Sequence, residues 1–263
     1  MSKFLDPKNN YAFKRIFGTE KNKDILIHFL NDILGRTGEA KIEDVAFLSP
    51  IQDPEIAAKK ESIVDVLCRD STGVRFICEM QVARTSGFEK RVQFYASKAY
   101  SSQAGVGDQY QNLKEVIFIA ITDFILFPHK SDYKSDHVIL DKVTYEHDLK
   151  DFSFTFIELP KFPKTKEDQL ENIVEKWCYF FKYASETSEK DLRKIVGSDV
   201  IIGKAMMSWL DIIGPRKNRL CMNGLRKTRM IMYLASNKVE WKEKSKEKLK
   251  WQKTYLKLGY LST

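Results

Sequence analysis

The chain has 263 residues, of which 43% are hydrophobic and 12% aromatic, which is enough for one substantial core and argues against global disorder. No apolar run approaches the ~20 residues of a membrane span, and the first residues lack the apolar segment of a secretion signal, so we expect a cytoplasmic protein without a membrane partner. The formal net charge of +8 is uneven, because residues 214–263 carry +11 and the preceding residues sum to −3.

The cysteines and histidines give no support to zinc binding or to Ser/His or Cys/His catalysis. No two cysteines form a CxxC pair, no histidine stands at a zinc-like spacing, and none lies beside a candidate nucleophile. Cys68 and Cys78 fall inside expected strands, where we interpret them as small core residues.

The first elements in chain order are helical. Apolar spacing predicts a helix over residues 9–34. Because Gly18 and Thr19 interrupt the pattern, the alternative is two helices joined by a short turn. A first strand is expected over 43–48, two strands joined by a polar turn over 62–82, and a helix over 88–103.

The middle of the chain predicts further strands. The continuous apolar run over 116–121 indicates a strand buried on both faces. Short apolar segments over 138–140 and 143–145 flank Asp141 and Lys142 and suggest a hairpin, and another strand is expected over 152–159. Beyond Pro160 and Pro163 the pattern is helical, over residues 169–184, 192–196, 201–213, 220–235 and 239–258.

The two strands within residues 62–82 each carry a carboxylate inside an apolar run, at Asp65 and at Glu79. A three-residue turn would place Asp65 directly opposite Glu79, whereas a two-residue turn would place it beside Cys78. The first register is favoured, because the second puts a carboxylate into the core.

Two neighbouring carboxylates repel each other, and a divalent cation relieves the repulsion. We therefore expect Asp65, Glu79 and the backbone carbonyl of Met80 to bind Mg²⁺, with Mn²⁺ as an alternative, and Gln81 to orient an attacking water or contact a phosphate. In the alternative interpretation, Asp65 and Glu79 face solvent on a sheet edge. Glu20 or Asp24 is a further candidate carboxylate for the metal.

The order of these elements resembles the αβββαβ core of the PD-(D/E)XK nuclease superfamily, and within it the transposase-like, recombination-promoting nuclease group. The residues that carry the resemblance are Asp6, Pro7, Tyr11, Phe13, Lys14, Phe17, Gly18, Phe29, Leu30, Asn31, Leu34, Asp65, Gly73, Glu79, Met80, Gln81, Arg91, Gln93, Tyr95, Tyr100, Gln103, Tyr110, Leu113 and Lys114. The resemblance implies an α/β fold like that of restriction endonucleases, with a mixed sheet, and metal-dependent DNA cleavage linked to recombination or mobile elements. It implies Asp65, Glu79 and Gln81 as catalytic residues.

One residue departs from the superfamily pattern, because Gln81 stands where the usual lysine is expected. Glutamine supplies no positive charge, so a cation on the next helix is expected to compensate, with Lys90, Arg91 and Lys98 as candidates. We expect these three residues and Tyr95 to contact DNA.

The resemblance covers roughly residues 4–160, so we expect a nuclease core over 1–160 and a helical, basic region over 161–263. Trp241, Trp251 and Tyr255 alternate with lysines and would bind DNA. Alternatively, these aromatic residues would pack on the body of the protein, or on a partner subunit in a homo-oligomer formed through the C-terminal helices. Two competing functions remain for the chain, an inactive nucleic-acid-binding module and an oligomerising protein on the same fold.

Overall fold

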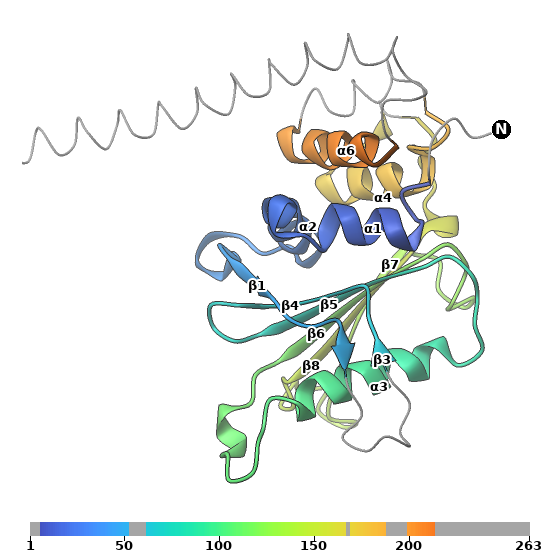
Figure 1. Ribbon diagram of the computed structural model, residues 1–263. Coiled ribbons are helices and arrows are strands. Elements are labelled where there is room, and N and C mark those ends of the chain that lie inside the picture. The colour runs from blue at the N-terminus through green and yellow to red at the C-terminus, as the bar shows by residue number, and fades with distance from the viewer. Residues whose placement is uncertain (1–5, 53–61, 167–168, 188–198, 214–263) are drawn as a thin grey trace, which may run out of the picture. The chain divides into compact units, whose positions relative to one another are not determined.

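The computed structural model describes residues 6–52, 62–166, 169–187 and 199–213 (Figure 1). The chain divides into two compact units, Met1–Ile213 and Gly214–Thr263. The second unit lies outside the described residues, as do the helices expected over 192–196, 220–235 and 239–258.

A six-stranded mixed sheet forms the centre of the first unit, in the order β1 (Val45–Phe47), β4 (Val66–Asp70), β5 (Arg75–Gln81), β6 (Val116–Thr122), β8 (Phe152–Glu158) and β7 (Lys134–Val138). Strands β5, β6 and β8 are parallel to one another, and the other neighbours are antiparallel. The short strands β2 (Ile51–Gln52) and β3 (Ser62–Ile63) pair separately. The expected α/β class with a mixed sheet is confirmed.

Helices cover both faces of the sheet (Figure 1). Helices α1 (Asn10–Phe17), α2 (Lys23–Leu34), α4 (Ile173–Tyr183) and α6 (Val200–Ile213) lie on one side, and α3 (Phe88–Ser101) lies on the other. Among the described residues, single 3₁₀ turns over Glu20–Asn22, Gly38–Ala40, Tyr110–Asn112 and Leu159–Lys161 connect these elements. In the described residues no helix is both long enough and apolar enough to span a bilayer.

Aromatic rings hold the first helix layer together. The ring of Phe17 lies 4.7 Å from Phe13, 5.0 Å from Phe29 and 5.8 Å from Trp177, measured between centroids. All four side chains are fully buried, and Trp177 Nε1 donates a hydrogen bond to Asp32 at 2.8 Å. Helix α4 therefore shares one core with α1 and α2, although it follows them by more than a hundred residues.

A second core lies between α3 and the sheet. Its buried members come from α3 and from alternate positions of the strands, where side chains point to one face. They are Val64, Leu67, Ile77, Phe88, Val92, Tyr95, Ala96, Ala99, Val116, Phe118, Ala120 and Phe156. Glu79 follows Ile77 by two residues on β5, so its side chain leaves the strand on the same face, at the border of this core.

Most of the expected elements are confirmed. The helical region over 9–34 is two helices separated at Gly18, as the alternative states, and β6 is buried along its whole length. Cys68 and Cys78 are fully buried core residues.

The expected hairpin over 138–145 is wrong. Strand β7 ends at Val138 and pairs with β8, while the segment after Leu140 forms a turn. The carboxylate of Asp141 accepts hydrogen bonds from the backbone N–H groups of Val143 and Thr144, both at 2.7 Å. This local capping by an aspartate competes with strand pairing, and it prevails here.

Candidate active site

A hairpin between β4 and β5 sets the register of the two carboxylates. Val66 pairs with Cys78 and Leu67 with Ile77, so Asp65 and Glu79 occupy the next opposed positions. The backbone N–H of Asp70 donates to the Val74 carbonyl at 3.0 Å and closes a turn of three residues that ends in Gly73, whose φ of 93° lies in the left-handed region that glycine adopts without strain. This is the register that the burial argument favours, and the alternative register beside Cys78 is excluded.

Asp65 and Glu79 extend the hydrogen bonding between β4 and β5, because their carboxylates accept hydrogen bonds from backbone N–H groups. The backbone N–H of Asp65 donates to Glu79 Oε2 at 3.2 Å, and the backbone N–H of Met80 donates to Asp65 Oδ2 at 2.9 Å. Each residue is only 7% exposed. The interpretation in which both carboxylates face solvent on a sheet edge is therefore wrong.

The hydrogen-bond pattern of β5 shows on which edge of the strand the Met80 carbonyl lies. On β5 the odd-numbered residues bond to β6, since Arg75 N–H donates to Glu115 and Gln81 C=O accepts from Asp123. Within a strand, the N–H and C=O of one residue point to the same side. Because the Met80 N–H bonds to Asp65, the Met80 carbonyl also points to the edge of β5 on which Asp65 lies.

Arg91 approaches the pair from α3. Its Nη2 lies 2.6 Å from Gln81 Oε1 and 3.4 Å from Glu79 Oε1, and its guanidinium carbon lies 4.8 Å from the ring centre of Phe88. The Gln81 amide nitrogen donates to the Ala83 carbonyl at 2.8 Å, so both ends of that amide have partners. Arg91 Nε is buried and has no hydrogen-bond partner among the described residues.

Lys14 and Asn10 approach the same pair from α1. Lys14 Nζ lies 3.3 Å from Asp65 Oδ1. The amide of Asn10 is assigned with its nitrogen toward Asp65, where it donates to both carboxylate oxygens at 2.8 and 3.0 Å, because the reverse orientation would place oxygen against oxygen. Two helices on opposite faces of the sheet therefore each bring one cation to the carboxylates.

Burial raises the pKa of both carboxyl groups. For Glu79, burial and then the neighbouring charge of Asp65 raise the pKa to about 7, against the opposing effect of Arg91. For Asp65, burial raises the pKa even though the Met80 N–H and Lys14 favour the charged form. Two nearby cations therefore do not fully compensate for placing two carboxylates at one buried position.

The donor atoms fit a hard divalent cation. Carboxylate oxygens of Asp65 and Glu79 and the Met80 carbonyl are hard ligands, and Mg²⁺ commonly binds one or two protein carboxylates and keeps several waters. No group of three or more Asp, Glu, His or Cys side chains suited to a metal occurs in the described part of the chain. The fit therefore rests on two carboxylates and one carbonyl.

The structure separates the remaining candidate residues. Lys90 is exposed on α3, one residue before Arg91. Tyr95 is 9% exposed and lies in the α3 core with its ring centre 5.8 Å from the Arg91 guanidinium carbon. Lys98 is half-buried, about 10 Å along the helix from Arg91, with Nζ 5.9 Å from the ring of Phe94.

The two further carboxylates on the N-terminal segment are turned elsewhere. Glu20 lies 4.0 Å from Lys23, and Asp24 pairs with Lys204 of α6. Neither has a contact with Asp65 or Glu79, so the structure does not bring them to the pair.

Sequence reasoning missed the contribution of α1 to this site. Asn10 and Lys14 are four residues apart, so they lie on one side of the helix, away from the apolar side formed by Phe13 and Phe17. This polar pair is a detectable signal. The sequence does not show which residues this polar pair contacts, because only the packing of α1 on the sheet decides which strand the polar side meets.

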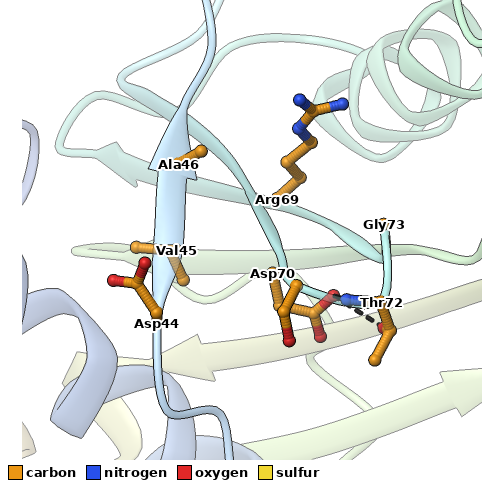
Figure 2. Close-up of a pocket in the computed structure, with 8 residues that line it drawn as sticks. Asp44, Val45, Ala46, Arg69, Asp70, Thr72 and Gly73 are labelled. Carbon is orange, nitrogen blue, oxygen red and sulfur yellow. Dashed lines mark hydrogen bonds between the residues drawn. The ribbon is translucent and has the colours of Figure 1, made fainter.

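A separate shallow pocket lies at the far end of β4, between β1 and the hairpin turn (Figure 2). Asp70 lines it, about 16 Å along the strand from Asp65, and its carboxylate accepts hydrogen bonds from Thr72 and Val74 of the turn. Figure 2 shows Arg69 extending away from that carboxylate. Since the polar groups of this pocket stabilise the turn, we place the candidate site at Asp65 and Glu79.

An αβββαβ core with a carboxylate pair at the end of its central hairpin defines the PD-(D/E)XK class of nuclease folds. The model of one family, described as PD-(D/E)XK nuclease family transposase, matches residues 7–246, and the chain belongs to this family. Neither the curated proteins nor the solved structures compared with the chain include a match. The family links the chain to nucleases of mobile elements.

Proposed function

We propose that the protein is a divalent-metal-dependent DNA endonuclease that acts in recombination or in the movement of mobile elements. The observation that carries the proposal is the buried pair of Asp65 and Glu79, with a shared network of hydrogen bonds and a raised Glu79 pKa. A buried, like-charged carboxylate pair is costly for a fold and is typical of sites that bind a cation.

Asp65 and Glu79 would hold the metal ion through their side chains, and Met80 through its backbone carbonyl. A bound Mg²⁺, or Mn²⁺ as the alternative, lowers the pKa of water and neutralises charge on a phosphate. In the hydrolysis, a water oxygen forms a bond to phosphorus while the bond from phosphorus to the leaving sugar oxygen breaks. The proton of the water passes to solvent, and the leaving oxygen gains one.

Gln81 and Arg91 would keep this arrangement in place. Both ends of the Gln81 amide have partners, which supports a role in holding Arg91 in preference to direct contact with water. Arg91 in turn bonds to Glu79 and lies against Phe88. Lys90 and Lys98 on the same helix remain candidates for contact with the DNA backbone. Tyr95 would act on the DNA indirectly, through its contact with Arg91.

Cleavage of supercoiled plasmid by the purified chain tests the proposal. With Mg²⁺, the wild type should nick or linearise the plasmid, and Asp65→Asn and Glu79→Gln should each lower the rate by about 10²-fold or more. Glu43→Gln is the matched control, because Glu43 is an exposed carboxylate with no contact to the pair. It should cleave like the wild type.

Other outcomes would point to the competing functions. A wild type that leaves the plasmid intact but retards it on a gel would indicate an inactive DNA-binding module. An intact plasmid together with a mass in solution of two or more chains would favour the oligomerising protein. The cytoplasmic location, self-association through the C-terminal helices and the boundary between residues 160 and 161 stay predictions.

A further inference from the structure

Lys14 is the cation of this site with the freest side chain. It lies 39% exposed, and its ammonium contacts Asp65 alone among the described residues, at 3.3 Å. An ammonium has three N–H donors, so this contact leaves two of them for another acceptor. Lys14 is thus bound to a proposed metal ligand and still faces solvent.

Arg91 differs from Lys14 in each of these respects. Its side chain is 28% exposed, its guanidinium lies 4.8 Å from the ring centre of Phe88, and it already bonds to both Glu79 and Gln81. Moving Arg91 toward a phosphate would break the contact that holds Gln81. Arg91 is therefore suited to fixing the carboxylate pair, and Lys14 to meeting an incoming anion.

The position of α1 brings Lys14 to the hairpin at a fixed distance. Helix α1 ends at Gly18, whose N–H donates to the Lys14 carbonyl at 2.8 Å. A Cβ at Gly18 would lie 2.8 Å from that carbonyl oxygen and 3.4 Å from the side chain of Val66, the first residue of β4. The helix end therefore packs directly against the strand that follows Asp65.

We propose that Lys14 contacts the scissile phosphate and supplies the positive charge that Gln81 lacks. The proposal rests on the nuclease function proposed above. Lys14 donates hydrogen bonds to a non-bridging phosphate oxygen and stabilises the negative charge that grows there as the bond to the leaving oxygen breaks. Lys14 itself transfers no proton in this step.

The proposal predicts opposite changes in metal binding and in cleavage. Lys14 beside Asp65 repels a divalent cation, so Lys14→Gln should lower the Mg²⁺ concentration for half-maximal thermal stabilisation by about fivefold. The same variant should lower kcat for plasmid nicking by about 10²-fold with a smaller change in KM. Lys14→Arg keeps the charge and should retain kcat to within about tenfold.

The experiment compares the full-length wild type, Lys14→Gln, Lys14→Arg and the control Lys21→Gln in both assays. Lys21 is an exposed lysine of the neighbouring 3₁₀ turn, and its variant should match the wild type. Loss of Mg²⁺ affinity and of kcat together would show that Lys14 only organises Asp65, and would overturn the assignment. A Lys14→Gln variant with kcat within about threefold of the wild type would also overturn it.

The nuclease proposal fails in a distinguishable way. In that case the wild type leaves the plasmid intact at every Mg²⁺ concentration, and both proposals are overturned. A wild type that cleaves, beside a Lys14→Gln variant that cleaves equally well, overturns the role of Lys14 alone.

Discussion

Glu79 is the residue in which the opposing forces at the site can be compared. Arg91 lies 3.4 Å from its carboxylate, yet the pKa of Glu79 is raised to about 7, because burial and the charge of Asp65 outweigh that contact. A group with this pKa exchanges its proton near neutral pH. Its titration therefore provides a direct measure of the site in the folded protein.

The first prediction concerns the pH dependence of stability without metal. Between the ordinary Glu pKa of 4.5 and about 7, the folded protein keeps a proton on Glu79 that the unfolded chain has lost. The free energy of unfolding should therefore fall as pH rises through this range, by up to about 3 kcal/mol, and level off above it. Burial also raises the pKa of Asp65, so this residue acts in the same direction.

Urea unfolding in EDTA at about pH 5 and about pH 8 measures this change. Glu79→Gln should lose most of the decline, and the exposed control Glu43→Gln should keep it. An equal decline in Glu79→Gln and the wild type would show that other groups cause it.

The second prediction concerns the lysine missing from the superfamily pattern. Gln81→Lys alone should lower the cleavage rate by about tenfold or more, because the new ammonium would stand beside Arg91, which now lies 2.6 Å from the Gln81 oxygen. Combining Gln81→Lys with Arg91→Gln removes the repulsion and should recover part of the rate. A single Gln81→Lys variant faster than the wild type would contradict this account.

At the scale of elements, α4 belongs to the same core as α1 and α2. Trp177 is fully buried, with its ring centre 5.3 Å from Phe29, and bonds to Asp32 of α2. Because α1 carries Asn10 and Lys14 to the site, a helix late in the chain supports the position of residues near its beginning.

The third prediction tests that support. Trp177→Ala should lower the free energy of unfolding by about 3–5 kcal/mol, since it empties the centre of the aromatic core and leaves Asp32 without this partner. Thermal and urea unfolding measure the loss. Tyr110→Ala is the control, because Tyr110 is 84% exposed, and its change should stay within about 0.5 kcal/mol.

The sequence predicts elements whose apolar pattern is strong, and it fails where polar contacts decide. The buried run of β6 and the hairpin of β4 and β5 follow from apolar residues and a glycine turn. Strand β7 has the polar sequence Lys-Ser-Asp-His-Val, which carries little strand signal, and it forms because β8 offers an edge.

The candidate site divides along the same line. Asp65, Glu79 and Met80 come together because strand register is a local property, and register can be worked out from the turn length. Lys14 and Asn10 join them through the packing of α1 on the sheet, which involves pairs more than fifty residues apart. The pattern of residues along the chain does not show which residues come into contact through this packing.

At the scale of the whole molecule, charge is distributed unequally between the two units of the chain. Residues 214–263 hold 14 Lys and Arg and 3 Asp and Glu, whereas the rest of the chain is slightly acidic. Such a distribution favours binding of a polyanion by residues 214–263.

The fourth prediction separates these contributions by truncation after Ile213. If about six cations of the removed segment contact phosphates, the plot of log affinity for duplex DNA against log salt should be shallower by about 5. The truncated protein should keep its stabilisation by Mg²⁺, because Asp65 and Glu79 lie in the remaining unit. Unchanged DNA affinity together with a reduced mass in solution would assign the segment to self-association.

The charges of the two carboxylates and two cations predict how the proposed binding of metal would affect the proposed binding of DNA. With both carboxylates ionised, Asp65 and Glu79 balance Lys14 and Arg91, so the site as folded offers a phosphate little net attraction. A bound divalent ion would bring the net charge of the site, with the ion included, to about +2. Metal and DNA should therefore bind with positive linkage, each raising the affinity for the other by the same factor.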